Sequence, residues 1–160
     1  MRLRGYCIGL ALSLASGSTL LPPPTAAQPI DWVRYRVPET GAAVDVPSSI
    51  FTEEAGSPEA GHGKRFVTSD RRADLTMQSV ANDAGLSPAA FLAQKNPPPN
   101  IVYKKVTAQF FVVSSFRQGK IWYDRSNFAG RSIHCVLINY PAQEKREWDG
   151  IVTRISNTLS

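Results

Sequence analysis

Residues 101–140 read IVYKKVTAQFFVVSSFRQGKIWYDRSNFAGRSIHCVLINY, and this stretch decides the fold. Pairs of turn-forming residues divide it into four segments, at Ala108-Gln109, Gln118-Gly119 and Ala129-Gly130. Glycine tolerates the positive φ that a two-residue hairpin turn needs. The sequence therefore predicts a four-strand antiparallel meander, with strands over residues 101–107, 110–117, 120–128 and 131–140.

Two segments of this meander are apolar on both faces. Phe110–Val113 is wholly apolar, and Ile133–Ile138 contains only one polar residue, His134. Strands of this kind are typical of positions inside a sheet, where layers cover both sides. We therefore expect the meander to be part of a larger sheet.

Shorter segments before the meander predict four further strands, over Trp32–Val37, Ala43–Pro47, Lys64–Ser69 and Ala73–Val80. Apolar and polar residues alternate along the first and the last of these, which is the period of a half-buried strand. In the last, Leu75 and Met77 are expected to face the core. The segment Glu53–Gly63 is rich in Gly, Glu, Ser and Pro and predicts an exposed loop.

Two helices complete the expected fold. Ser87 suits the N-cap and Pro88 the first turn of a short mid-chain helix that ends near Lys95-Asn96. A second helix is expected from about Ala142, with one apolar stripe formed by Trp148, Ile151, Val152, Ile155 and Leu159. The fold class is therefore α+β: a mostly antiparallel sheet with a C-terminal four-strand meander, a short mid-chain helix, and a C-terminal amphipathic helix packed on the sheet.

Residues 1–27 have the pattern of a cleaved signal peptide. Arg2 and Arg4 precede a short apolar segment, Cys7–Ala15, and small residues end at Ala27. The apolar segment is shorter than the ~20 residues that a membrane span needs, although an uncleaved anchor is the alternative. We therefore expect an exported protein, periplasmic or secreted, with one domain over residues 28–160. Loss of the two arginines lowers its formal charge from +5 to +3.

Basic residues gather in the predicted meander, with aromatic residues between them: Lys104, Lys105, Arg117, Lys120, Arg125 and Arg131. Such a surface could bind a protein partner or an anionic component of the cell envelope. The alternative is that these charges protect exposed strand edges from pairing with other chains. The net charge is too small, and the basic residues are too scattered, for the basic stripe that is typical of nucleic-acid binding.

No catalytic or metal-binding motif stands out. Cys135 is the only cysteine after the leader, and His134 beside it would point to the opposite face of a strand. His62 lies between two glycines, in Gly61-His62-Gly63. A small periplasmic hydrolase that uses His62 or Cys135 is therefore the alternative to a non-enzymatic protein. Two histidines and one cysteine at wide spacing predict no metal site, and no cofactor is expected.

One resemblance extends over most of the mature chain. The residues that carry it are Ile101-Val102-Tyr103-Lys104, Phe111-Val112-Val113-Ser114, Ile121-Trp122-Tyr123, His134-Cys135 and the closing Ile155–Leu159. The chain resembles small exported bacterial proteins of unknown function, and its strand order and closing helix are similar to the PsbP-like α/β/α sandwich superfamily. Members of that superfamily are mainly binding or assembly factors, which implies a non-enzymatic binding or envelope-associated module. No site residue transfers, because no family site motif is present.

Overall fold

The computed structural model describes residues 29–160, so the predicted leader over residues 1–27 lies outside the described residues. The elements follow one another as β1 (Trp32–Arg36), β2 (Ala43–Pro47), β3 (Glu53–Glu54), β4 (His62–Val67), β5 (Asp74–Ala81), α1 (Pro88–Lys95), β6 (Asn100–Val106), β7 (Phe110–Arg117), β8 (Lys120–Ala129), β9 (Ser132–Pro141), a 3-10 turn (Ala142–Glu144) and α2 (Lys145–Thr158).

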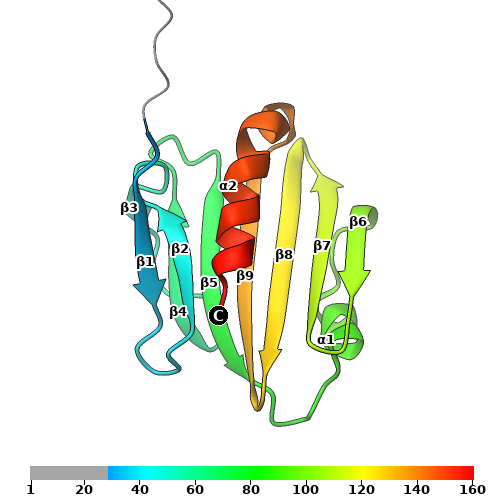
Figure 1. Cartoon of the computed structure of the whole chain (residues 1–160). Helices are drawn as coiled ribbons and strands as arrows, with labels where there is room; N and C mark the ends of the chain where they lie inside the picture. The colour runs from blue at the N-terminus through cyan, green and yellow to red at the C-terminus, as the bar shows by residue number, and fades with distance from the viewer. Residues whose placement is uncertain (1–28) are drawn as a thin grey trace, which may run out of the picture.

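Seven of these strands form one antiparallel sheet in the order β3-β4-β5-β9-β8-β7-β6, while β1 and β2 form a separate hairpin (Figure 1). The meander β6 to β9 and the α+β class are confirmed. What the sequence did not predict is that β9 pairs with β5, which joins the earlier hairpin to the meander. This pairing places β9 at the centre of the sheet and leaves β6 at one edge.

Helix α2 and the β1–β2 hairpin cover one face of the sheet (Figure 1). Trp148, Val152 and Ile155 of α2 pack with apolar residues from β2, β5 and β9 into the larger core. The ring of Trp148 stacks on Tyr140 at 5.2 Å between centroids and lies 5.8 Å from Phe51. The predicted apolar stripe is therefore the element that closes this face.

Helix α1 covers part of the opposite face, over β7 and β8. Its N-cap is the predicted Ser87, whose hydroxyl accepts a hydrogen bond from the Ala90 amide at 3.2 Å. Leu92 packs against the fully buried Phe111 and Val113 in a second, smaller core. Because α1 is only eight residues long, much of this face is left to β8 and β9 side chains.

The segment predicted as a loop, Glu53–Gly63, contains regular structure at both of its ends. Glu53 and Glu54 form β3 against β4, and β4 itself begins at His62. A Cβ atom on Gly63 would lie 2.1 Å from the Met77 carbonyl oxygen, so β4 approaches β5 more closely than a side chain permits. Composition concealed the start of β4, because glycine in a strand looks like a loop residue.

The β1–β2 hairpin is held by the last residue of α2 and the two residues that follow it. Ala43 and Ser160 exchange two backbone hydrogen bonds of 2.7 and 2.9 Å. The Arg34 guanidinium donates to the Thr158 carbonyl at 2.7 Å and to the Ser160 hydroxyl at 2.8 Å. The hairpin is thus attached to the domain through residues more than a hundred positions away.

Candidate functional site

Charge is segregated along the chain and therefore across the fold. Residues 84–143, which build α1 and β6 to β9, contain seven basic residues and a single carboxylate, Asp124, for a net charge of +6. The remaining described residues contain nine basic and twelve acidic residues, for a net charge of −3. We call residues 84–143 the basic segment.

Cations in the basic segment also differ in how they are neutralised. Elsewhere in the described chain, six of the nine basic residues form ion pairs: Arg34, Lys64, Arg71, Arg72, Lys145 and Arg154. In the basic segment only Lys95 and Arg131 do so, with Asp124 and Asp83. The other five have no carboxylate partner among the described residues: Lys104, Lys105, Arg117, Lys120 and Arg125.

The structure divides the six basic residues that the sequence grouped together. Lys105 and Arg125 lie on the α2 side of the sheet, where both charges stand over the Phe110 ring, at 5.5 and 4.8 Å from its centroid. Lys104 lies on the α1 side of β6. Arg117 and Lys120 oppose each other at the end of the β7–β8 ladder. Arg131 lies at the β8–β9 turn and pairs with Asp83 at 3.0 Å.

Strand β6 forms an exposed edge with apolar as well as basic side chains. Within residues 29–160 it pairs only with β7, and all seven of its residues are exposed. Five of the seven most exposed large apolar side chains gather on β6 and the adjoining end of β7: Ile101, Val102, Tyr103, Val106 and Phe116. We call these five side chains, with Lys104, Lys105 and Arg125, the edge surface.

A groove runs beside the edge surface, between α2 and strands β6 to β8. Its two hollows have volumes of about 310 and 370 Å³ and share Tyr103, Tyr123 and Thr153 as walls. The Tyr123 hydroxyl donates to the Ser156 hydroxyl at 2.6 Å, and Arg125 donates to the same oxygen at 3.3 Å. These bonds hold the Arg125 side chain between the sheet and the helix.

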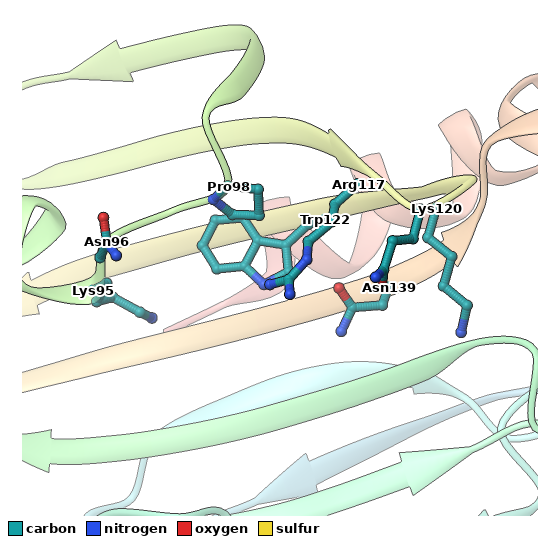
Figure 2. Close-up of a pocket in the computed structure, with 8 residues that line it drawn as sticks. Lys95, Asn96, Pro98, Arg117, Lys120, Trp122 and Asn139 are labelled. Atoms are coloured by element: carbon teal, nitrogen blue, oxygen red, sulfur yellow. The ribbon is translucent and has the colours of Figure 1, made fainter.

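A larger groove of about 520 Å³ lies on the opposite, α1 side, and we call it the α1-side groove. Figure 2 shows Trp122 in the middle of it, near Pro98, with Lys95 and Asn96 at one end and Lys120 and Asn139 toward the other. The Arg117 side chain extends from that second end toward Trp122. Of these residues, the sequence indicated only Arg117 and Lys120 as candidates. For the other residues of the groove, the sequence contains one indication. Asp124, which lies beneath them, is the only carboxylate between Asp83 and Glu144.

An ion pair is buried beneath the α1-side groove. The Lys95 ammonium lies 2.5 Å from a carboxylate oxygen of Asp124, which is 0% exposed. Burial raises the pKa of Asp124, and the positive charge of Lys95 opposes that rise. The Ser126 hydroxyl lies within hydrogen-bond distance of both Asp124, at 3.2 Å, and the Cys135 sulfur, at 2.8 Å.

The residues of the hydrolase alternative lie apart. Cys135 is completely buried on the α1 side of the sheet, and burial raises the pKa of its thiol to about 12. His134 and His62 lie on the other side of the sheet, in line with Ser79. The Ser79 hydroxyl and His134 Nδ1 are 3.1 Å apart, and burial lowers the pKa of His134. The structure therefore brings neither histidine to the thiol.

The Cys135 thiol is expected to be unreactive in the folded protein. A thiolate is the reactive form of cysteine, and a pKa of about 12 leaves very little thiolate at neutral pH. Iodoacetamide should label Cys135 only after urea has unfolded the domain, as intact-mass measurements over time would show. Rapid labelling without urea would contradict this burial and would support a role for the thiol as a nucleophile.

Neither α-helix within residues 29–160 has the length and apolar character that crossing a membrane requires. No three His, Cys, Asp or Glu side chains in this part of the chain are grouped so that they could hold a metal ion.

Comparisons with known proteins agree with the architecture. No family model matches the sequence, and no curated protein matches it. Among solved structures, the fold is similar to that of cyanobacterial PsbP (CyanoP) from Synechocystis sp. PCC 6803, with a TM-score of 0.60 over 84% of this chain and 95% of that one. The sequence identity is 7%, so the likeness concerns the fold. The described chain therefore has a PsbP-like α+β fold, as its strand pattern and closing helix predicted.

Proposed function

We propose that this protein is an exported, non-enzymatic module that binds an acidic protein partner through the edge surface. The observation that carries the proposal is the segregation of charge, because the one carboxylate of the basic segment is buried and paired while five cations have none, three of them on the edge surface. Unpaired charges of one sign attract a partner of the opposite sign and speed its approach.

Exposed apolar side chains at the same place favour a protein over a simple anionic surface. Tyr103 is 52% exposed and Val102 is 67% exposed, and both lie among the unpaired lysines of β6. Protein interfaces combine apolar and aromatic side chains at the centre with charged residues at the rim. A bare edge strand can also accept a strand from a partner through backbone hydrogen bonds. The PsbP-like fold is compatible with this role but does not assign it.

The proposal is tested by reversing charge on the edge surface. The variant Lys104→Glu, Lys105→Glu, Arg125→Glu should weaken partner binding by roughly 100-fold or more, because like charges brought together cost several kcal/mol. Crosslinking pull-downs of the tagged mature protein from its own cell-envelope fraction, at low and high salt, would measure the loss. The partner of the wild type should also dissociate at high salt.

The matched control changes charge equally on the acidic part of the domain. Arg36→Glu, Arg71→Glu, Arg146→Glu replaces three exposed arginines and should retain the partner. A partner that both triple variants retain, or that high salt does not release, would contradict the electrostatic proposal. The mass of the protein isolated from its source would show separately whether residues 1–27 are removed.

A further inference from the structure

Two positive charges face each other at the end of the β7–β8 ladder, and neither is neutralised by a carboxylate of the described residues. Arg117 and Lys120 are directly opposite residues in this antiparallel pair, on the α1 side of the sheet. Like charges at opposite positions of a ladder destabilise it. No carboxylate among the described residues pairs with either of them. An anion held between the two side chains would turn this repulsion into attraction.

The neighbouring positions supply hydrogen-bond donors and an apolar wall. In the next row of the sheet, Ser115, Trp122 and Asn139 lie side by side across β7, β8 and β9. The indole N–H of Trp122 can only donate, and the Asn139 amide already donates to Asp74 at 2.8 Å. The Ser115 hydroxyl is buried with no hydrogen-bond partner in the described chain. The Trp122 indole and the two cations can only donate, whereas Asn139 keeps its amide oxygen as an acceptor, so it is the positive charge of Arg117 and Lys120 that favours an oxyanion.

The groove has the volume of a small-molecule site. Its volume of about 520 Å³ falls within the range of roughly 300–1,000 Å³ that is typical of ligand pockets. Trp122 and Pro98 line its middle, and the Arg117 side chain extends from one end of the groove toward Trp122 in Figure 2. At the other end Lys95 is neutralised by Asp124, so the positive charge that remains for a ligand belongs to Arg117 and Lys120.

We propose that the α1-side groove binds a small ligand that places a phosphate or carboxylate group between Arg117 and Lys120 and a ring against Trp122. This site lies on the other face of the sheet from Lys105 and Arg125 and does not depend on the proposed protein partner. Arg117 matches the planar geometry of either group, because a guanidinium offers paired N–H donors.

The experiment titrates the mature protein with phenyl phosphate and with benzoate and follows the indole N–H resonances by NMR. Trp122→Phe assigns the resonance that belongs to Trp122. We expect this resonance to shift saturably with at least one of the two compounds, and the tighter one identifies the group that the cations prefer. Arg117→Ala should raise the dissociation constant at least ~10-fold, since a hydrogen bond to a charged group is lost.

Matched variants separate this site from general charge effects. Arg131→Ala removes a cation that is already paired with Asp83 and should leave the titration unchanged. Lys120→Ala should weaken binding as Arg117→Ala does, and without ligand neither should lower the urea midpoint, because each relieves the repulsion. The Lys104→Glu, Lys105→Glu, Arg125→Glu variant should still bind the compound. No saturable shift with either compound, or equal weakening by Arg117→Ala and Arg131→Ala, would overturn the proposal.

Discussion

Lys95→Ala is expected to destabilise the domain by about 3–5 kcal/mol, because it removes the partner of a buried carboxylate. Asp124 is 0% exposed, and among the described residues its side chain contacts the Lys95 ammonium at 2.5 Å and accepts a hydrogen bond from the Ser126 hydroxyl. Without that ammonium the protein must bury an unpaired charge or protonate the carboxyl group. Urea unfolding at neutral pH, followed by circular dichroism, would measure the loss.

The stability that Lys95→Ala loses is expected to depend on pH in one direction. Removing Lys95 takes away the charge that opposes the raised pKa of Asp124, so that pKa rises further in the folded state. A group whose pKa is raised on folding contributes stability below its unfolded pKa of about 3.9 and loses it as the pH rises through the folded value. The deficit of Lys95→Ala relative to the wild type should therefore shrink on acidification.

Two further variants keep this test specific. Lys120→Ala removes a lysine from the same groove that has no carboxylate partner, and it should cost less than ~0.5 kcal/mol. Adding Asp124→Asn to Lys95→Ala should restore much of the stability, because a neutral amide has no charge to desolvate. A loss below ~1 kcal/mol for Lys95→Ala, unchanged by Asp124→Asn, would mean that the carboxylate is not buried as described.

Trp148→Ala is expected to cost about 3–5 kcal/mol, which is the usual range when a large aromatic side chain is removed from a core. Trp148 is 6% exposed, stacks on Tyr140, and donates its indole N–H to Glu144 at 3.2 Å. The cavity left behind would separate α2 from β9. The urea midpoint and the slope of the transition would measure the loss.

Val33→Ala serves as the control for this second variant. Val33 is also apolar but is 56% exposed on β1, so its truncation should change the free energy of unfolding by less than ~0.5 kcal/mol. If Trp148→Ala and Val33→Ala had similar effects, α2 would not close the core of the domain. Trp148→Phe should lie between the two, because it keeps a ring against Tyr140.

The elements predicted most reliably are those whose signals are local. The Gln118-Gly119 turn and the Ser87 cap are set by neighbours in the sequence, and both occur as expected. The spacing of Trp148 and Ile155 is likewise a local signal, because it places both apolar side chains on one face of a single helix. The pairing of β5 with β9 has no such signal, because two distant strands with compatible faces can be placed in several orders.

The candidate sites were predicted only in part for the same reason. The sequence shows that Lys104, Lys105, Arg117, Lys120, Arg125 and Arg131 are close in number, but alternation along strands sends them to opposite faces. Lys95 and Asp124 come from a helix and a strand whose contact depends on how α1 packs. Counting the charged residues between Asp83 and Glu144 would have indicated that the edge surface and the α1-side groove are basic. It would not have shown which cations belong to which of the two.

The attachment of the β1–β2 hairpin to residues 158–160 has a consequence for the order of folding. A two-stranded hairpin is marginally stable by itself, and the bonds from Arg34 and Ala43 join residues more than a hundred positions apart. Closing so long a loop is slow and cannot start before α2 exists. Val44 and Val46 are therefore expected to stay exposed to solvent while the meander assembles. Docking of this hairpin is the step at which we expect a nascent chain to need protection from aggregation.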